Sequence, residues 1–381
     1  MHIGIDARLY GPEQGGLGRY IEQLILHLEQ IPTTDTFSIF LRSENWEAYQ
    51  PKNKNFRKVM ADIPWYGWKE QVLLPKIFER EHVDIMHFPH WNIPLYYNQP
   101  FVVTIHDLLL LHFPTRAAST LGPVTYWFKQ YMYKKVLRHA AQHAEHILAT
   151  SEFTKQDIHH TLDIALKKIT VTYQAAFLKK EKGSAALQTT PVKWLERLGI
   201  TKPYLLYVGV AYPHKNLDGL LTAWEIFCAK YGNNYQLVLA GKHNYFYKKL
   251  LANQRASKNE NKPIFTGFVS DTELETLYKG AALYVFPSFY EGFGLPPLEA
   301  MSYNLPIAAS NASCLPEILG EAAVYFDPHQ PTEMAAVFFK TLTDQAMRHA
   351  LIAAGQKRYP RFSWKKLAEK TAETYRASLD T

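Results

Sequence analysis

The sequence predicts an α/β protein made of two doubly wound, Rossmann-like domains that face a cleft. Short β-branched and aromatic runs alternate with helical segments along almost the whole chain, which is typical of parallel sheets covered by helices on both faces. The alternation stops at a polar stretch near residue 180 and then restarts. The length of 381 residues suits two domains of ordinary size.

The N-terminal domain is expected to cover residues 1–180. Its expected strands are His2–Asp6, Phe37–Leu41, Asp84–His87, Phe101–Ile105 and His146–Ala149. Its expected helices are Gly18–Glu29, Tyr126–His143 and Phe153–His159. Residues 181–195 continue the polar stretch and have the composition of a linker.

The restarted pattern predicts a second domain over residues 196–361. Its expected strands are Tyr204–Val208, Gln236–Ala240, Ile264–Thr266, Leu283–Phe286, Pro306–Ala309 and Ala323–Phe326. Its expected helices are Leu217–Tyr231, Tyr245–Ala252 and Asp271–Gly280. Ser270 or Asp271 is expected to cap the last of these. The final residues, 362–381, are typical of a capped amphipathic helix.

The overall composition narrows the classes of function. A net charge of +7 indicates an acidic partner, such as a nucleotide phosphate or an anionic membrane. The charge is spread over both halves without a compact nucleic-acid motif, so nucleic acid is not an expected partner. Two cysteines, no signal-peptide pattern and no apolar run long enough to span a bilayer predict a cytoplasmic location.

The segment from Ser288 to Glu299, Ser-Phe-Tyr-Glu-Gly-Phe-Gly-Leu-Pro-Pro-Leu-Glu, carries the strongest functional signal. It joins a buried strand to a helix. Gly292 and Gly294 let the backbone approach a ligand, and the free N–H groups of the new helix favour an anion. Glu291 lies just before this site, and Glu299 is expected in the first helical turn. Carboxylates beside a phosphate site accept hydrogen bonds from hydroxyls, which predicts a sugar-nucleotide site.

Two other interpretations of the carboxylates stay open at this point. Glu299 alone could complement the helix dipole without touching a ligand. A glycosidase also uses two carboxylates, but it places them across the scissile bond on separate elements. Glu291 and Glu299 share one loop–helix unit, which favours binding over acid–base catalysis.

The pattern Glu291-Gly-Phe-Gly-Leu-Pro-x-Leu-Glu299-Ala-Met resembles the signature of retaining family-4 glycosyltransferases with the GT-B fold. The resemblance covers nearly the whole chain and is greatest to mannosyltransferase-like members. It implies retaining transfer of a hexose, with GDP-mannose as the preferred donor, to a glycan or lipid-linked acceptor in surface polysaccharide synthesis. It also implies that the C-terminal helix crosses back to the first domain. The alternatives are a UDP-sugar-dependent transferase for glucose or GlcNAc, an epimerase, a phosphorylase and a non-catalytic nucleotide-sugar-binding protein.

The resemblance also assigns donor-binding residues in the second domain. They are Gly209, His214, Val269, Phe293, Gly294, Leu295 and Glu299. The resemblance implies that Glu291, Lys215 and His106 of the first domain are catalytic. Glu291 and three backbone N–H groups would hold the sugar, and Glu299 would hold the ribose. Val269 lies in the loop that would hold the base.

A cation is expected beside the leaving diphosphate, because neutralising that charge is the main electrostatic demand of the reaction. Lys215 matches the lysine that relatives carry after this strand. The arginine that accompanies it in relatives is missing, and His214 stands beside the lysine instead. Either a protonated His214 or Arg19 would then supply the second positive charge.

Two segments of the first domain complete the expected site. Gly11–Tyr20 follows the first strand as a phosphate-approach loop would, although a tight turn explains it as well. Within the resemblance, Gly15 and Gly16 face the donor phosphate. His106 ends a strand and corresponds to the family histidine beside the donor sugar, with a purely structural histidine as the alternative. Asp107 is not expected to form a dyad with it, because adjacent strand residues point to opposite sides.

No metal or other cofactor is expected. His139, His143 and His146 approach the spacing of metal ligands, but His146 begins a strand. The chain contains no Asp-x-Asp element. Enzymes of the resembling family stabilise the leaving diphosphate with cations and helix dipoles.

Two aromatic–basic segments, Tyr126–Arg138 and Trp65–Lys69, suggest contact with an anionic membrane. Such contact at the inner face of the membrane would bring the enzyme to a lipid-linked acceptor. A helix that packs its aromatic side against the sheet explains the same pattern.

Overall fold

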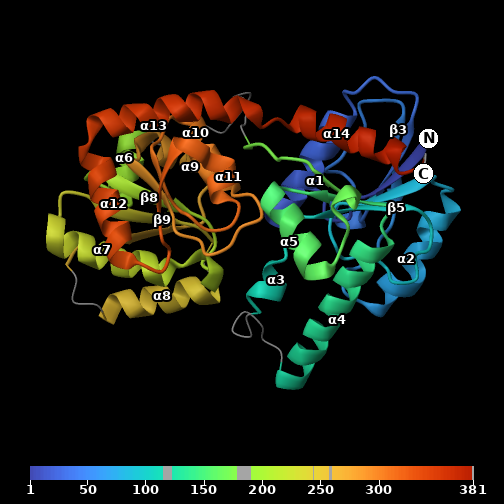
Figure 1. Ribbon diagram of the computed structural model, residues 1–381, viewed down its shortest axis with the longest axis horizontal. Helices are drawn as coiled ribbons and strands as arrows, with labels where there is room; N and C mark the ends of the chain where they lie inside the picture. The colour runs from blue at the N-terminus through green and yellow to red at the C-terminus, as the bar shows by residue number, and fades with distance from the viewer. Residues whose placement is uncertain (115–121, 178–189, 243, 257–259, 380–381) are drawn as a thin grey trace. The chain divides into compact units, whose positions relative to one another are not determined.

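The computed structural model describes residues 1–114, 122–177, 190–242, 244–256 and 260–379, which form two compact units. The first unit holds Met1–His112, residues 122–174 and the C-terminal segment from Ser363 (Figure 1). The second holds Ala175–Phe362 together with Phe113 and Pro114. Of the expected linker, residues 181–189 lie outside the described residues, and residues 191–195 fall in helix α6 (Pro191–Arg197).

The first unit is built on a seven-stranded parallel sheet. Its strands are β1 (His2–Asp6), β2 (Thr36–Leu41), β3 (Phe56–Met60), β4 (Ile85–Phe88), β5 (Phe101–Ile105), β6 (His146–Ala149) and β7 (Ile169–Val171). Their order across the sheet is β3-β2-β1-β4-β5-β6-β7, which confirms the doubly wound prediction. The sequence pattern did not identify β3 and β7, the two edge strands.

Helices lie on both faces of this sheet. They are α1 (Gly15–Leu28), α2 (Trp68–Arg80), α3 (Leu109–His112), α4 (Pro123–His143), α5 (Glu152–Leu162) and α14 (Trp364–Ala377). One buried cluster joins Phe78 of α2, Leu137 of α4 and Ile158 of α5, so these three helices share one face. Helices α1 and α14 pack together on the other face, where the Tyr20 and Trp364 rings lie 6.1 Å apart (Figure 1).

The second unit is built on a six-stranded parallel sheet. Its strands are β8 (Tyr204–Val208), β9 (Gln236–Ala240), β10 (Ile264–Gly267), β11 (Leu283–Phe286), β12 (Ile307–Ser310) and β13 (Ala323–Phe326). The order β10-β9-β8-β11-β12-β13 is again doubly wound. Its other helices are α7 (Leu217–Tyr231), α8 (Tyr245–Ala256), α9 (Asp271–Gly280), α10 (Leu295–Ser302), α11 (Leu315–Leu319), α12 (Pro331–Thr343) and α13 (Gln345–Arg358).

Local signals place several of these helices correctly. The Ser270 hydroxyl accepts a hydrogen bond from the Glu273 N–H, and the Glu273 carboxylate accepts one from the Ser270 N–H, so Ser270 caps α9 as predicted. Ser363 caps α14 in the same way through the Lys366 N–H. The pattern left α2, α3, α6, α11, α12 and α13 unassigned. Helix α12 is held on α7 by the stacked rings of Tyr231 and Phe339, 4.0 Å apart.

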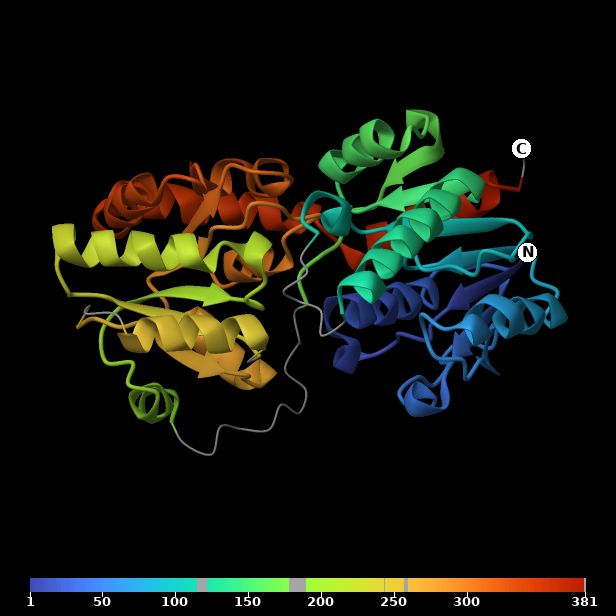
Figure 2. The ribbon, with the colours of Figure 1, turned by 90° about the horizontal axis from the view of Figure 1, so that it is seen from below.

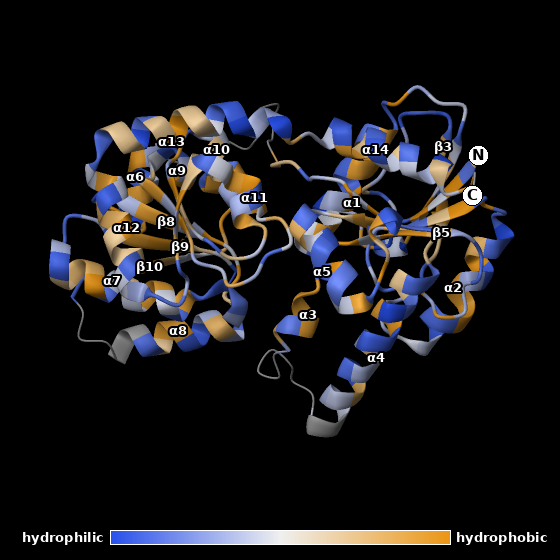
Figure 3. Cartoon of the chain, in the orientation of Figure 1, coloured by the Kyte–Doolittle hydropathy of each residue, from blue (hydrophilic) through white to orange (hydrophobic). Residues whose placement is uncertain are grey.

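The strands of both sheets are the most apolar parts of the chain, and helices flank them on both sides (Figures 2 and 3). None of the helices within the described ranges combines the length and apolar character that crossing a bilayer requires. In each sheet the strand order reverses once, between β1 and β4 and between β8 and β11. Ligands of doubly wound folds bind at the carboxyl ends of the strands beside such a reversal.

Candidate functional site

The loops after β8 and β11 bring a cation and a carboxylate together in the second unit. Lys215 follows β8, and Glu291 follows β11. The Lys215 Nζ donates a hydrogen bond to the Glu291 Oε1 at 2.6 Å, and the two side chains are only 16% and 11% exposed. This pair therefore lies at the point where the strand order reverses, and it is largely shielded from solvent.

The Lys215 loop is fixed by its neighbour Asn216. Asn216 has a φ of 55°, and its side-chain amide donates hydrogen bonds to the carbonyls of Pro287 and Pro328 at 3.2 and 2.7 Å. A Cβ at Gly219 would lie 2.3 Å from the Asn216 Oδ1, so this position needs glycine. The loop also meets the β11 loop directly, because the Phe289 N–H donates to the His214 carbonyl at 2.8 Å.

His214 does not supply the missing positive charge. Its side chain is buried, and burial together with the charge of Lys215 lowers its pKa to about 4. The ring is therefore neutral at pH 7, and the expectation of a protonated His214 does not fit the structure. Arg19, the other residue considered for this charge, belongs to the first unit.

The glycine loop leads into α10 with one change from the sequence expectation. Gly294 has a φ of 87° and precedes the helix, whose first residue is Leu295. Glu299 is thus the fifth residue of α10, so its expected place in the first turn is wrong. Its carboxylate accepts a hydrogen bond from the buried Tyr278 hydroxyl at 3.0 Å, a contact that dipole compensation alone does not explain.

Backbone contacts hold the remaining loops of this edge close together. A Cβ at Gly241 would lie 2.0 Å from the Gly209 carbonyl oxygen, so the loops after β8 and β9 meet backbone to backbone. The Tyr247 hydroxyl donates to the same carbonyl at 3.0 Å. Val269 is half-buried in the loop after β10. The Glu291 N–H donates to the Ser313 hydroxyl at 3.0 Å, which ties in the loop after β12.

In the first unit, the glycine-rich segment begins α1 earlier than expected. The helix starts at Gly15 rather than Gly18, so Gly15 and Gly16 lie in its first turn instead of in a preceding loop. Both are exposed, and a Cβ added at either would meet nothing within 4 Å. Gly18 is different, since its Cβ would lie 2.0 Å from the Gly11 carbonyl oxygen. Gly18 is needed for packing, whereas Gly15 and Gly16 leave open space.

His106 is held by hydrogen bonds at both ring nitrogens. Its Nε2 is 2.9 Å from the Pro89 carbonyl oxygen, so this nitrogen carries the proton and donates. Its Nδ1 accepts from the Gln174 side-chain amide at 3.1 Å. Burial lowers its pKa to about 4, which keeps the ring neutral at pH 7. Asp107 has a separate structural contact: its Oδ1 accepts a hydrogen bond from the Leu109 N–H at the start of α3.

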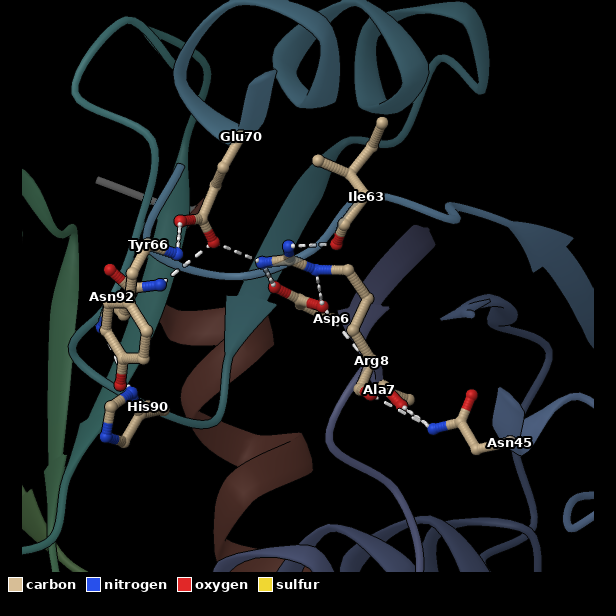
Figure 4. Close-up of polar contacts among 9 residues, drawn as sticks. All are labelled: Asp6, Ala7, Arg8, Asn45, Ile63, Tyr66, Glu70, His90 and Asn92. Atoms are coloured by element: carbon tan, nitrogen blue, oxygen red, sulfur yellow. Dashed lines mark hydrogen bonds and ion pairs between the residues drawn. The ribbon is translucent and has the colours of Figure 1, made fainter. Parts of the chain in front are cut away.

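A buried ionic network, absent from the sequence predictions, lies at the end of β1 (Figure 4). The Arg8 guanidinium, 1% exposed, donates to the Asp6 and Glu70 carboxylates, with 2.8 Å from Nη2 to each. Asn92 donates to the same Glu70 oxygen at 2.9 Å. Burial lowers the pKa of Arg8, but the two carboxylates outweigh it and the net shift is upward. Asp6 and Arg8 share one side of the chain, but Glu70 is 62 positions away and carries no local signal.

This network borders a small hollow that is lined in part by Trp65, Tyr66 and His90. Burial and the nearby His106 lower the pKa of His90 to about 3, so a neutral imidazole lines the hollow at pH 7. The ionic network holds the chain just after β1 in place through Arg8.

Each of four other histidines, His87, His139, His143 and His146, has a structural partner of its own. The buried His87 lies 2.7 Å from the Tyr375 hydroxyl of α14 and 2.8 Å from the Thr104 hydroxyl. His139 and His143 stack at 4.1 Å, whereas His146 lies 2.7 Å from the Thr170 hydroxyl. Among the side chains that the structure describes, no group of three or more His, Cys, Asp and Glu is placed to hold a metal ion.

Comparisons with known proteins cover both units. A family model described as Glycosyltransferase Family 4 matches residues 14–176, and one described as Glycosyl transferases group 1 matches residues 193–358. O-antigen chain mannosyltransferase B of Escherichia coli is 30% identical over 303 residues, which cover 78% of this chain and 75% of that protein. Serotype-specific mannosyltransferase WbdA of Escherichia coli is 30% identical over 245 residues, 63% of this chain, but the match spans only 30% of WbdA.

Solved structures extend the likeness in fold to nearly the whole chain. Sucrose-phosphate synthase from Thermosynechococcus elongatus aligns with a TM-score of 0.74 at 18% identity, over 99% of this chain and 98% of that one. HepE from Anabaena, in complex with UDP-glucose, aligns with a TM-score of 0.73 at 16% identity, over 99% of both chains.

Proposed function

The chain belongs to the glycosyltransferases with the GT-B fold, and on that premise we propose that it transfers mannose from GDP-mannose with retention of configuration. The acceptor is a glycan or a lipid-linked glycan in the synthesis of a surface polysaccharide. The mannosyltransferase relative named for the O-antigen chain supports this choice of sugar and product. The single observation that carries the proposal is the Lys215–Glu291 pair at the reversal of the second sheet.

Each residue of this edge has a task in the proposal. Glu291 accepts hydrogen bonds from the donor sugar, aided by the backbone of Phe293, Gly294 and Leu295. Gly294 has a φ of 87°, which turns the chain into α10. Because Pro296 and Pro297 have no N–H, the N–H groups at the start of this helix are those of Leu295 and Leu298. Glu299 accepts from the ribose hydroxyls, with its orientation set by the Tyr278 hydroxyl.

The diphosphate needs positive charge because it leaves as an anion. Lys215 supplies this charge by shifting its ammonium group from Glu291 to the phosphate oxygens. His214, neutral at pH 7, contributes its buried ring to the shape of the loop rather than charge. Gly209 and Val269, in the loops after β8 and β10, lie towards the nucleotide.

The first unit contributes Gly15, Gly16 and His106 to the proposal. The two glycines begin α1 with open space in front of them, as close approach of a phosphate requires. His106 uses both ring nitrogens on Pro89 and Gln174, so it is assigned to positioning rather than to proton transfer.

In the proposed reaction, the acceptor hydroxyl oxygen bonds to the anomeric carbon while the bond from that carbon to the phosphate oxygen breaks. The acceptor attacks from the side of the departing phosphate, and a phosphate oxygen takes the hydroxyl proton. No protein nucleophile takes part. The products are the elongated glycan and GDP, and no cofactor is consumed.

A UDP-sugar donor is the second candidate, because the solved neighbour HepE was crystallised with UDP-glucose. The two candidates are separated by a thermal shift measurement against GDP-, UDP-, dTDP- and ADP-sugars. We expect GDP-mannose to raise the melting temperature more than GDP does, and Glu291→Ala to lose that sugar-dependent part. If UDP-glucose raised the melting temperature and GDP-mannose did not, the donor would be a UDP-sugar and not GDP-mannose. No rise with any nucleotide sugar would contradict a donor site at this edge.

A further inference from the structure

Helix α4 turns a set of aromatic side chains away from the sheet. Trp127, Phe128 and Tyr131 are 73%, 65% and 63% exposed. The buried side of the helix is formed by other residues, namely Tyr126, Tyr133, Val136, Leu137, Ala140 and Ala141. Packing against the sheet therefore accounts for Tyr126 and Tyr133, but not for these three rings.

Basic residues continue the exposed side of α4. Lys134, Lys135 and Arg138 follow Tyr131 at helical spacing and are all exposed. The 21 residues of α4 contain four basic residues and no Asp or Glu. The exposed side of this helix is thus aromatic at its N-terminal half and positively charged beyond it.

Helix α2 repeats the arrangement. Trp68, Val72 and Leu73 are 69%, 43% and 37% exposed, and Lys69 and Lys76 are exposed between and after them. The only acidic residue between positions 66 and 76 is Glu70, which is fully buried against Arg8. One turn further on, Glu79 is exposed on the same side of α2 as Val72 and Lys76, so this side carries one carboxylate among its lysines and apolar side chains.

The two helices lie on the same face of the first sheet, because both contribute side chains to one buried cluster. An aromatic chain connects them. The Tyr66 ring lies 6.2 Å from Trp91, and Trp91 lies 4.6 Å from Tyr133 of α4. We call the exposed aromatic, aliphatic and basic residues on these two helix sides the aromatic–basic face. They are Trp68, Lys69, Val72, Leu73, Lys76, Trp127, Phe128, Tyr131, Lys134, Lys135 and Arg138.

We propose that the aromatic–basic face docks on an anionic phospholipid surface. Lysine and arginine attract acidic headgroups, and tryptophan and tyrosine rings favour the boundary between headgroups and acyl chains. Protein–protein interfaces, in contrast, are depleted in lysine, and this face contains four lysines. The proposal rests on the proposed function only in that a lipid-linked acceptor would lie in the same membrane, and binding needs no donor.

The test is sedimentation of the full chain with vesicles, without nucleotide. Vesicles of phosphatidylglycerol and phosphatidylcholine are compared with phosphatidylcholine alone, at low and high salt. We expect binding to the anionic vesicles that weakens with salt. Lys134→Glu/Lys135→Glu should weaken it at least tenfold, because two attractive charges become repulsive. Trp127→Ser/Phe128→Ser should weaken it comparably at both salt concentrations, because it removes the apolar anchor.

A matched control comes from the second unit. Tyr245, 62% exposed, lies beside the exposed Lys248 and Lys249 on α8. Tyr245→Ser therefore removes an exposed aromatic ring elsewhere, and Lys248→Glu/Lys249→Glu makes the same double charge reversal elsewhere. These variants should bind vesicles like the unchanged protein. All variants should keep their melting temperature and their donor-induced shift, which separates this test from that of the proposed function.

Three outcomes would overturn the proposal. The first is no binding to anionic vesicles at low salt, and the second is equal binding by the α4 and α8 variants. The third is concentration-dependent self-association that the Trp127→Ser/Phe128→Ser variant abolishes while vesicle binding is absent. That result would assign the face to a second copy of the chain.

Discussion

Lys215 shows how one residue's role depends on a distant partner. It is 76 positions from Glu291 in the chain, yet their charged atoms are 2.6 Å apart. In the proposed reaction the ammonium group moves to the leaving diphosphate, which is a charge-stabilising interaction made strongest in the transition state.

Lys215→Met is therefore expected to lower kcat by about 10²–10³-fold, the range found when one preorganised charge-stabilising donor is removed. Steady-state transfer kinetics with a defined acceptor would measure this. Lys279→Met is the control, because Lys279 is an exposed lysine paired with Glu275 on α9. Equal kcat values for the two variants would contradict the assignment of Lys215.

Tyr278 and Glu299 form a second pair with a separable effect. Removing the Tyr278 hydroxyl leaves the Glu299 carboxylate without the donor that orients it. Tyr278→Phe should weaken donor binding by about tenfold, corresponding to about 1.4 kcal/mol for one hydrogen bond to a charged group. Isothermal titration calorimetry would measure the affinity of the variant and of the unchanged protein for the donor and for a phosphate ligand that contains no ribose. The same loss for both ligands would place Glu299 away from the ribose.

At the scale of elements, the start of α1 combines two kinds of glycine. Gly18 packs against the backbone of the segment before it, whereas Gly16 faces open space. The sequence shows both as members of one glycine-rich loop. The packing of the short 3-10 helix η1 (Pro12–Gln14) beside the first turn of α1 is what distinguishes the buried Gly18 from the exposed Gly16.

Gly18→Ala should destabilise the first unit by about 3 kcal/mol, because the added methyl group meets backbone oxygens that cannot move independently. Gly16→Ala should leave stability unchanged and instead reduce transfer, since the methyl group would occupy the space assigned to the phosphate. Urea denaturation and transfer kinetics on both variants would decide. Full activity in Gly16→Ala would remove this turn from the donor site.

At the scale of the whole molecule, the C-terminal helix completes the first unit. Tyr375 of α14 meets the buried His87 at 2.7 Å, and Arg376 pairs with Asp35 at 3.0 Å. The N-terminal amine also pairs with Asp35 at 3.0 Å, so both ends of the chain meet one carboxylate. Helix α14 is therefore part of the first unit, although the segment that precedes it belongs to the second.

Buried neutral histidines make the stability of this unit depend on pH. Burial and His106 lower the pKa of His87 from 6.5 to about 3. Below pH 6.5 the unfolded chain binds a proton here and the folded chain does not, so stability is full above that pH and falls towards pH 3. His87 alone should cost about 2 kcal/mol between pH 7 and pH 5.

His87→Gln should remove that part of the loss, so its stability should change less between pH 7 and pH 5 than that of the unchanged protein. Urea denaturation of the first unit at both pH values measures the difference. His349→Gln, at an exposed histidine of α13 in the second unit, is the control and should keep the pH dependence of the first unit. An unchanged dependence in His87→Gln would show that His87 is not buried in its neutral form.

Most strands of the two sheets, and the helices that connect many of them, follow from local pattern. Buried parallel strands are short apolar runs, and apolar residues recur every three to four positions in the helices between them. Both doubly wound sheets could therefore be predicted. The missed strands β3 and β7 are sheet edges. β3 carries Arg57 and Lys58, and charged side chains are common on edges because they deter unwanted pairing. Such a strand looks like a loop in sequence.

The sequence by itself determined the two sheets, the segment from Ser288 to Glu299 and the resemblance to glycosyltransferases, because each depends on residues close together in the chain. Only the tertiary structure decided that Lys215 meets Glu291, that Glu70 completes the Arg8 network and that Trp127 faces solvent. These facts depend on which distant segments are packed together, and helical spacing alone does not say which side of a helix faces the sheet.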